Sequence, residues 1–120
     1  MIHSEQIVDH LYFKSEWINS VFGVPRESLV LISVLGDSME PTLSNGDLIL
    51  VDIRMSRVED GAIYVIQYDD ALLVKRLQKK YDGSVVIRSD NTLYEPEVLH
   101  GEDAINLKIV GRVIWAGGVI

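Results

Sequence analysis

The chain contains no cysteine and only three histidines, at positions 3, 10 and 100. Without cysteine there is no disulfide framework, no thiolate metal site and no cysteine nucleophile, and a reducing, cytoplasmic location is expected. A Ser-His-Asp triad would have to rest on His100, because the other two histidines lie in a polar N-terminal segment. The carboxylates Asp37, Asp47 and Asp52 lack the spacing of an EF-hand loop and indicate turn and surface positions. We therefore expect neither a metal nor a cofactor.

Long hydrophobic runs and positive charge are also scarce. The longest strongly apolar run is the seven residues 29–35, far short of the ~18 that would cross a bilayer. The N-terminus lacks the basic flank and apolar stretch of a signal peptide, so no membrane association is expected. Eleven basic against 18 acidic residues give a formal net charge of −7, which repels a phosphate backbone and argues against direct nucleic-acid binding by this domain. The pairs Lys75-Arg76 and Lys79-Lys80 are typical of a solvated hairpin face, and Arg76 is expected to be an ordinary solvated charge.

What the sequence does contain is a series of short strand signals, as in a single mostly-β domain. Residues 1–10 show no pattern and indicate a tail or linker, leaving 11–120 as the domain. Apolar spacing over residues 14–22 predicts one short amphipathic helix, with Ser15 as its N-cap. Residues 89–103 show no period and are expected to form a long loop or a pair of turns. Strands separated by turn residues predict a small mixed β-barrel or sandwich, with strands at 29–35, 47–53, 62–68, 71–78, 84–88 and 106–115.

A tight connection between the first two of these strands carries a serine. Gly36, Asp37 and Pro41 are turn-forming residues that shape this loop around Ser38, and Asp37 can fix it through an Asx-type bond. Such a loop can hold a hydroxyl outside the strand hydrogen-bond ladder. By itself, however, a serine in this setting is typical of an ordinary turn. The chain has neither Gly-x-Ser-x-Gly nor Ser-x-x-Lys, which excludes two common ways of activating it.

A base for Ser38 is available in the strand at 71–78. Side chains alternate along a strand, so Leu73, Lys75 and Leu77 should share one face, with Lys75 between two leucines. A lysine has a pKa of ~10.4 in water, but burial among apolar neighbours can lower it by up to ~3–5 units. A neutral Lys75 could then take the proton from Ser38 and return it to a leaving amine. The alternative is that Lys75 lies at a sheet edge and reaches water.

Taken together, these motifs resemble the C-terminal peptidase domain of LexA and the phage repressors, in its prophage type. The separation of 37 residues between Ser38 and Lys75 is similar to that of the family, and the likeness covers about residues 12 to 116. Type I signal peptidases share the dyad and the fold but need a membrane anchor. The matching segments are 36–42, 45–51, 74–77, 88–91 with Pro96, and 109–115.

This resemblance implies a Ser-Lys serine autopeptidase with Ser38 as nucleophile and Lys75 as general base. It also implies that the backbone N–H groups of Ser38 and Met39 stabilise the oxyanion. Domains of this family dimerise and cut their own chain at an upstream Ala-Gly or Cys-Gly bond, which separates them from an N-terminal helix-turn-helix domain that binds operator DNA. A RecA-type activator and an SOS response are part of the same expectation.

The chain departs from the family because it lacks the expected cleavage bond upstream of Ser38. No Ala-Gly or Cys-Gly precedes Ser38, since the first alanine is Ala62, and no helix-turn-helix fits into residues 1–28. The cleavage bond is therefore not visible in this chain, and we interpret the chain as a fragment of a longer repressor. Two other hypotheses stay open, namely a non-catalytic dimerisation domain of such a regulator and a polymerase accessory protein of the UmuD type.

Overall fold

A computed structural model of the chain describes residues 6–7 and 25–118. Eight strands form one sheet in the order β1-β2-β3-β8-β4-β5-β6-β7, and every neighbouring pair is antiparallel. The edge strands β1 and β7 are not paired with each other, so the sheet is open. The elements are β1 (Gln6–Ile7), the 3-10 helix η1 (Arg26–Ser28), β2 (Leu29–Ser33), β3 (Leu48–Asp52), β4 (Ile63–Tyr68), β5 (Ala71–Lys79), β6 (Val85–Arg88), β7 (Glu97–Leu99), α2 (Gly101–Ile105) and β8 (Lys108–Gly117).

The mostly-β fold is thus confirmed, and all six predicted strands are present with small shifts at their ends. Strands β4 and β5 form a hairpin that turns at Asp69-Asp70, since Tyr68 pairs with Ala71 across the turn. A second hairpin joins β5 to β6 through residues 80–84. The predicted helix over residues 14–22 lies outside the described residues. No helix of the described ranges is both long and apolar enough to cross a membrane.

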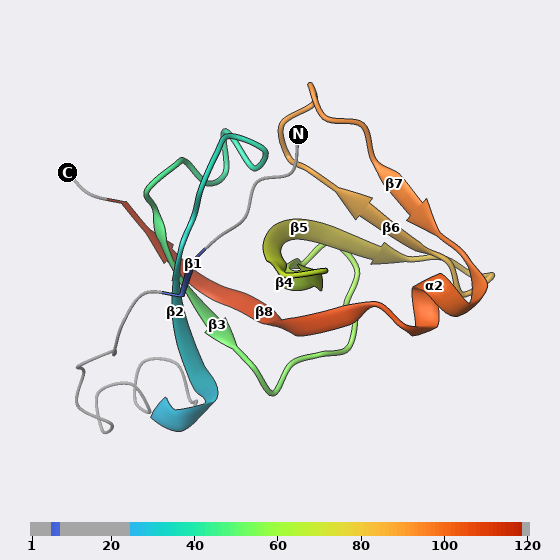
Figure 1. Cartoon of the computed structure of the whole chain (residues 1–120), viewed down its shortest axis with the longest axis horizontal. Helices are drawn as coiled ribbons and strands as arrows, with labels where there is room; N and C mark the ends of the chain where they lie inside the picture. The colour runs from blue at the N-terminus through green and yellow to red at the C-terminus, as the bar shows by residue number, and fades with distance from the viewer. Residues whose placement is uncertain (1–5, 8–24, 119–120) are drawn as a thin grey trace.

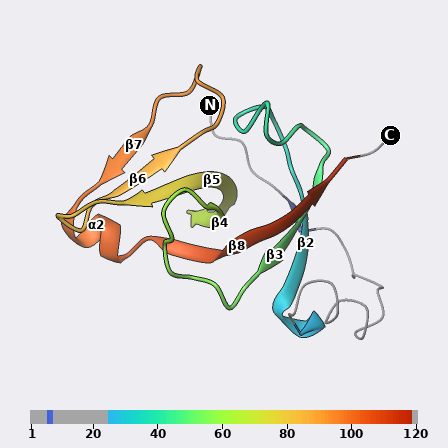
Figure 2. The ribbon, with the colours of Figure 1, turned by 180° about the vertical axis from the view of Figure 1, so that it is seen from behind.

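Strand β8 joins the two halves of the sheet (Figure 1). Its C-terminal part pairs with β3 and its N-terminal part with β4. The register shifts once in each pairing, which leaves Ile114 and Val110 as extra residues on β8. Bulges of this kind bend a strand and increase its twist. The bent β8 carries the chain from the β4-β5 half to the β2-β3 half, as the view from behind also shows (Figure 2).

The β4-β5 hairpin has apolar side chains on both of its faces. Val65 and Val74 belong to one buried cluster, together with Met39 from the Ser38 loop. Tyr64, Leu73 and Leu77 belong to a second cluster. Alternation along each strand sends neighbouring side chains to opposite clusters, as the sequence predicts for Leu73 and Leu77. Strand β5 is therefore held from both sides, which fixes the position of Lys75 in its middle.

Two expectations about loops are corrected by the structure. The stretch 89–103 contains β7 and the one-turn helix α2. Three residues of strand and five of helix are too short to show a period, and so they gave no signal. Asp52 is 1% exposed and not at the surface, because it ends β3 beneath Arg54, whose backbone and guanidinium both bond its carboxylate.

Candidate functional site

The loop that carries Ser38 is a series of tight turns. Gly36 has a φ of 88°, in the region that favours glycine, and its N–H donates to Asn45 Oδ1 at 2.8 Å. Further along, Glu40 N donates to Asp37 O and Leu43 N donates to Met39 O. The peptide bond between Glu40 and Pro41 is cis. Gly36, Asp37 and Pro41 therefore lie in the turns that surround Ser38.

The loop is anchored in the core by its own side chains. Met39 is 1% and Leu43 2% exposed, and both belong to the buried cluster that contains Val74 of β5. Ser38, between exposed Asp37 and buried Met39, is itself only 4% exposed. A buried side chain on the residue after Ser38 restricts how far the backbone there can move. The Ser38 loop is thus packed against the sheet and not a free surface turn.

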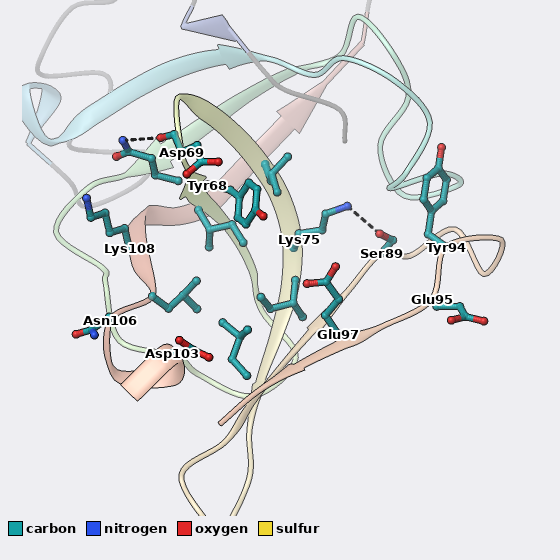
Figure 3. Close-up of a pocket in the computed structure, with 16 residues that line it drawn as sticks. Tyr68, Asp69, Lys75, Ser89, Tyr94, Glu95, Glu97, Asp103, Asn106 and Lys108 are labelled. Atoms are coloured by element: carbon teal, nitrogen blue, oxygen red, sulfur yellow. Dashed lines mark hydrogen bonds between the residues drawn. The ribbon is translucent and has the colours of Figure 1, made fainter. Parts of the chain in front are cut away.

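Lys75 lies in the middle of β5 and is half-buried. Its Nζ donates a hydrogen bond to Ser89 Oγ at 2.8 Å, and Figure 3 shows the side chain pointing toward that hydroxyl. The Nζ atom also lies 5.9 Å from the centroid of the Tyr94 ring, within the range of a cation–π contact. The ammonium group is therefore held by the segment that follows β6.

That segment, residues 89–94, also contacts the Ser38 loop. Asn91 N donates to Ser38 O at 2.9 Å, and Asn91 Nδ2 donates to Asp37 O at 3.0 Å. Tyr94 donates its hydroxyl to Asp37 Oδ1 at 2.5 Å, and this bond to a carboxylate raises the pKa of the Tyr94 phenol. We call residues 89–94 the bridging segment, because it binds the Ser38 loop and the Lys75 side chain at once.

Asp90 is the second residue of the bridging segment. Its carboxylate accepts two hydrogen bonds from Arg76, from Nε at 2.8 Å and from Nη2 at 2.7 Å. It accepts a third from Thr42 Oγ1 at 2.5 Å, and its own N–H faces Met39 Sδ at 3.4 Å. The bonds from Arg76, followed by the one from Thr42, hold the pKa of Asp90 below its usual range.

These contacts correct the expectation for Arg76, which is not an ordinary solvated charge. Its side chain is 34% exposed, and besides Asp90 it donates to Gly61 O. Nothing in the sequence around Arg76 indicates that it pairs with Asp90, 14 positions further along the chain. The other basic pair, Lys79 and Lys80, is exposed, as expected.

A pocket of about 690 Å³ opens on the face of the sheet that carries Lys75 (Figure 3). Its lining combines apolar side chains of β4, β5 and β6 with four carboxylates and two lysines. Lys75, Ser89 and Tyr94 belong to this lining, whereas Ser38 does not. The residues are Ile66, Gln67, Tyr68, Asp69, Leu73, Lys75, Ile87, Ser89, Tyr94, Glu95, Glu97, Leu99, Asp103, Asn106, Leu107 and Lys108.

Sequence reasoning assigned no role to several residues of this site. Ser89, Asp90 and Asn91 appeared only as part of a matching segment, and Tyr94 was not considered. The available signal was a run of short polar residues directly after a buried strand, where binding residues often lie. Among the described residues, no group of three or more His, Asp or Glu side chains is placed to hold a metal ion.

The arrangement places the elements that carry the predicted nucleophile and base against one segment, residues 89–94. The bridging segment brings the Ser38 loop and the Lys75 strand together, and the hydrogen bond that positions Lys75 Nζ goes to Ser89. A proton transfer from Ser38 to Lys75 stays a prediction, as does the role of the Ser38 and Met39 N–H groups.

Comparison with known proteins gives relatives among transcriptional repressors. An HTH-type transcriptional regulator of Haemophilus influenzae is 32% identical over 105 residues, which cover 88% of this chain and 44% of the relative. The 26 kDa repressor protein of Escherichia phage HK022 is 38% identical over 92 residues, or 77% of this chain and 39% of the relative. The LexA repressor of H. influenzae is 34% identical over 86 residues, or 70% and 40%.

The chain thus spans less than half the length of these relatives. A family model described as Peptidase S24-like matches residues 1–114, nearly the whole chain. The match includes the Ser38 loop, β5 with Lys75 and the bridging segment. The chain belongs to the Peptidase S24-like family, with LexA and the phage repressors among its relatives.

Proposed function

We propose that this chain is the C-terminal dimerisation and self-cleavage domain of a phage-type transcriptional repressor, and that it hydrolyses one peptide bond of its own longer chain. The observation that carries the proposal is the bridging segment, which holds Lys75 through Ser89 and the Ser38 loop through Asn91. A nucleophile and a base on separate elements can cooperate only if something fixes their relative position. The bridging segment does this for Ser38 and Lys75.

In the proposed reaction, neutral Lys75 removes the hydroxyl proton of Ser38 as Oγ attacks the scissile carbonyl carbon. The N–H groups of Ser38 and Met39 donate to the resulting oxyanion. The C–N bond then breaks, and Lys75 returns its proton to the leaving amine. Water hydrolyses the acyl-enzyme and regenerates the Ser38 hydroxyl.

The remaining partners are part of the same proposal, which is supported by relatives that are named as repressors and regulators. In the longer protein an N-terminal helix-turn-helix domain binds operator DNA, and this domain holds two copies together in the cytoplasm. A RecA-type activator triggers cleavage and so releases the operator. The formal charge of −7 is consistent with DNA binding by the N-terminal domain and not by this one, because an acidic domain contributes little to binding a phosphate backbone.

The direct test is cleavage of the full-length protein. We would incubate wild type, Ser38→Ala and Lys75→Ala at about pH 9–10, where a larger fraction of lysine side chains is neutral. Fragments should accumulate in the wild type and in neither variant. Ser44→Ala, which removes an exposed serine hydroxyl of the same loop, is the matched control and should be cleaved like the wild type. An uncleaved wild type would favour the non-catalytic dimerisation domain, and equal cleavage in all variants would exclude the dyad.

A second readout needs no scissile bond. An alkyl fluorophosphonate should phosphonylate Ser38 in the 120-residue chain itself: the Oγ–P bond forms, the P–F bond breaks and Lys75 accepts the hydroxyl proton. Peptide mass spectrometry would locate the label. Labelling should be lost in Ser38→Ala and fall at least tenfold in Lys75→Ala. A label on any other serine would contradict the assignment of the nucleophile.

A further inference from the structure

Asn91 donates two hydrogen bonds to two consecutive carbonyl groups of the Ser38 loop. Its backbone N–H donates to Ser38 O at 2.9 Å, and its side-chain Nδ2 donates to Asp37 O at 3.0 Å. These carbonyls belong to the peptide units that join Asp37 to Ser38 and Ser38 to Met39. One residue, 54 positions away in the chain, thus fixes both peptide planes on either side of the Ser38 Cα.

Fixing a carbonyl also fixes the N–H group of the same peptide unit. A trans peptide is planar, and its C=O and N–H bonds point in opposite directions. Both units are trans, since the cis bond of the described residues is the one between Glu40 and Pro41. With Asp37 O and Ser38 O directed toward Asn91, the N–H groups of Ser38 and Met39 are directed away from it. Successive N–H groups on one side of a turn form a concave site for an anion.

These two N–H groups are also available. Within residues 25–118, neither Ser38 N nor Met39 N donates a hydrogen bond, although Glu40 N and Leu43 N in the same loop both do. A backbone donor without a partner near a buried hydroxyl is costly to keep and needs an explanation. A negatively charged oxygen that forms only during a reaction would supply the missing acceptor.

The orientation of the Asn91 amide is itself fixed. Its Oδ1 accepts a hydrogen bond from Leu93 N at 3.0 Å, so the NH₂ end of the amide is the end that faces Asp37 O. Asn91 O further accepts from Tyr94 N at 3.1 Å. Both ends of the side chain are therefore used, and a flipped amide would lose both of its bonds.

We propose that Asn91 is a positioning residue that aims the backbone N–H groups of Ser38 and Met39 at the oxyanion. This inference rests on the proposed function, because it assumes that Ser38 attacks a carbonyl. It assigns no chemistry to Asn91, which touches neither the substrate nor the reacting atoms. By binding the carbonyl groups of Asp37 and Ser38, Asn91 sets the direction in which the N–H groups of Ser38 and Met39 point.

The test uses Asn91→Asp, which keeps an acceptor for Leu93 N and replaces only the donor that faces Asp37 O. Asn45→Asp is the matched control: it makes the same chemical change close to the same loop, where Asn45 Oδ1 accepts a hydrogen bond from Gly36 N. Fluorophosphonate labelling of Ser38 would be measured as a saturation rate constant and a half-saturation concentration over a range of pH. Asn91→Ala, which adds no charge, is the second variant.

We expect the saturation rate constant to fall about tenfold or more in both Asn91 variants and to be unchanged in Asn45→Asp, since loss of one oxyanion donor costs ~10²–10³ in rate. In Asn91→Ala the midpoint of the pH profile should not move, because the contacts of Lys75 are intact and no charge is added. A lower fraction of folded protein would not reproduce this, since it scales the labelled amount and leaves the rate constant of the folded molecules unchanged.

The backbone amide resonances of Ser38 and Met39 give a readout that does not depend on catalysis. Both should shift in the Asn91 variants and stay in place in Asn45→Asp. If the wild type is not labelled at Ser38, the proposed function fails and this inference with it, whatever the amide shifts. If the wild type is labelled and Asn91→Asp reacts as fast as Asn45→Asp, this inference alone is overturned. Unmoved amide resonances would overturn it as well.

Discussion

Arg76 and Asp90 form a two-pronged ion pair, with Nε 2.8 Å from Oδ1 and Nη2 2.7 Å from Oδ2. The pair joins Arg76, the neighbour of Lys75 on β5, to the bridging segment. Thr42, at the end of the Ser38 loop, donates to the same carboxylate. The Asp90 carboxylate thus accepts hydrogen bonds from both the Ser38 loop and β5, the two elements that carry the predicted nucleophile and base. Loss of its charge should weaken the attachment of both elements.

Asp90→Asn should destabilise the fold at neutral pH by about 2 kcal/mol, between the values for exposed and buried ion pairs, since the side chain of Asp90 is 14% exposed. The pKa of Asp90 is lowered in the folded protein, mainly by the Arg76 bonds. A group with a lowered folded pKa stabilises the fold above its unfolded pKa, ~3.9 for Asp, and the contribution disappears as the pH falls through the folded value.

Urea unfolding of wild type and Asp90→Asn at several pH values between about 7 and 3 would check this. The difference in unfolding free energy should be constant down to about pH 5 and shrink below pH 4. Glu95→Gln, at an exposed position of the neighbouring loop, should show little difference throughout. A difference for Asp90→Asn that stays the same down to pH 3 would mean that the carboxylate charge is not what the site uses.

Tyr64→Phe should lower the free energy of unfolding by about 1–3 kcal/mol. The Tyr64 side chain is completely buried, and its hydroxyl accepts from Glu59 N at 2.7 Å and donates to Arg57 O at 2.8 Å. Removing the hydroxyl leaves two backbone groups without their partner. Tyr81→Phe, at a fully exposed tyrosine, should change stability by less than ~0.5 kcal/mol. If chemical denaturation gave equal losses of unfolding free energy for the two variants, the hydrogen bonds of Tyr64 to residues 57 and 59 would not be stabilising the fold.

The regular part of the fold was predictable from the sequence because each strand carries its own pattern. Apolar and β-branched residues bounded by turn residues predicted the six longer strands, and alternation placed Leu73 and Leu77 on one face of β5. Those signals are local and need no knowledge of what the strand packs against. The same locality explains the misses, since β7 and α2 are too short to have a period.

The contacts of the site were beyond this kind of prediction. Thr42 with Asp90, Asn91 with Asp37 and Tyr94 with Asp37 are separated by 48, 54 and 57 positions. Each pair exists because the sheet brings β6 next to β5 and the Ser38 loop onto the same end. The bridging segment shows no periodic pattern in the sequence. The roles of Ser89 and Asn91 can therefore be recognised only from their contacts in the folded structure. Ser38 and Lys75 were named from the sequence, but their cooperation still needs a chemical test.

Gly111→Ala should destabilise the fold by about 1–3 kcal/mol, the usual cost of overpacking a tight site. Gly111 pairs with Val65 of β4 and adjoins Arg112, which pairs with Asp52 at the end of β3. An added methyl group at Gly111 would overlap the backbone carbonyl oxygen of Asp52 and lie 2.8 Å from Val51 Cγ1. A backbone oxygen cannot turn aside as a flexible side chain can, so β8 and β3 would have to separate. Thermal unfolding would detect this, with Ser56→Ala at an exposed position as the control. An unchanged melting temperature would show that the bend in β8 has room for the methyl group.

Ser89→Ala should slow the labelling of Ser38 by a fluorophosphonate about tenfold. The hydroxyl of Ser89 accepts the hydrogen bond that holds Lys75 Nζ, and a base that is poorly positioned contributes less of the ~10²–10⁴-fold that general-base catalysis supplies. Ser89→Thr keeps the hydroxyl and should restore most of the rate. Ser84→Ala is the control for the loss of a buried serine hydroxyl, because Ser84 is 2% exposed and bonds Asp82 in the β5-β6 hairpin. It should lower stability and leave the rate constant unchanged. If Ser84→Ala and Ser89→Ala slow the reaction equally, the effect of Ser89 is on the fold and not on Lys75.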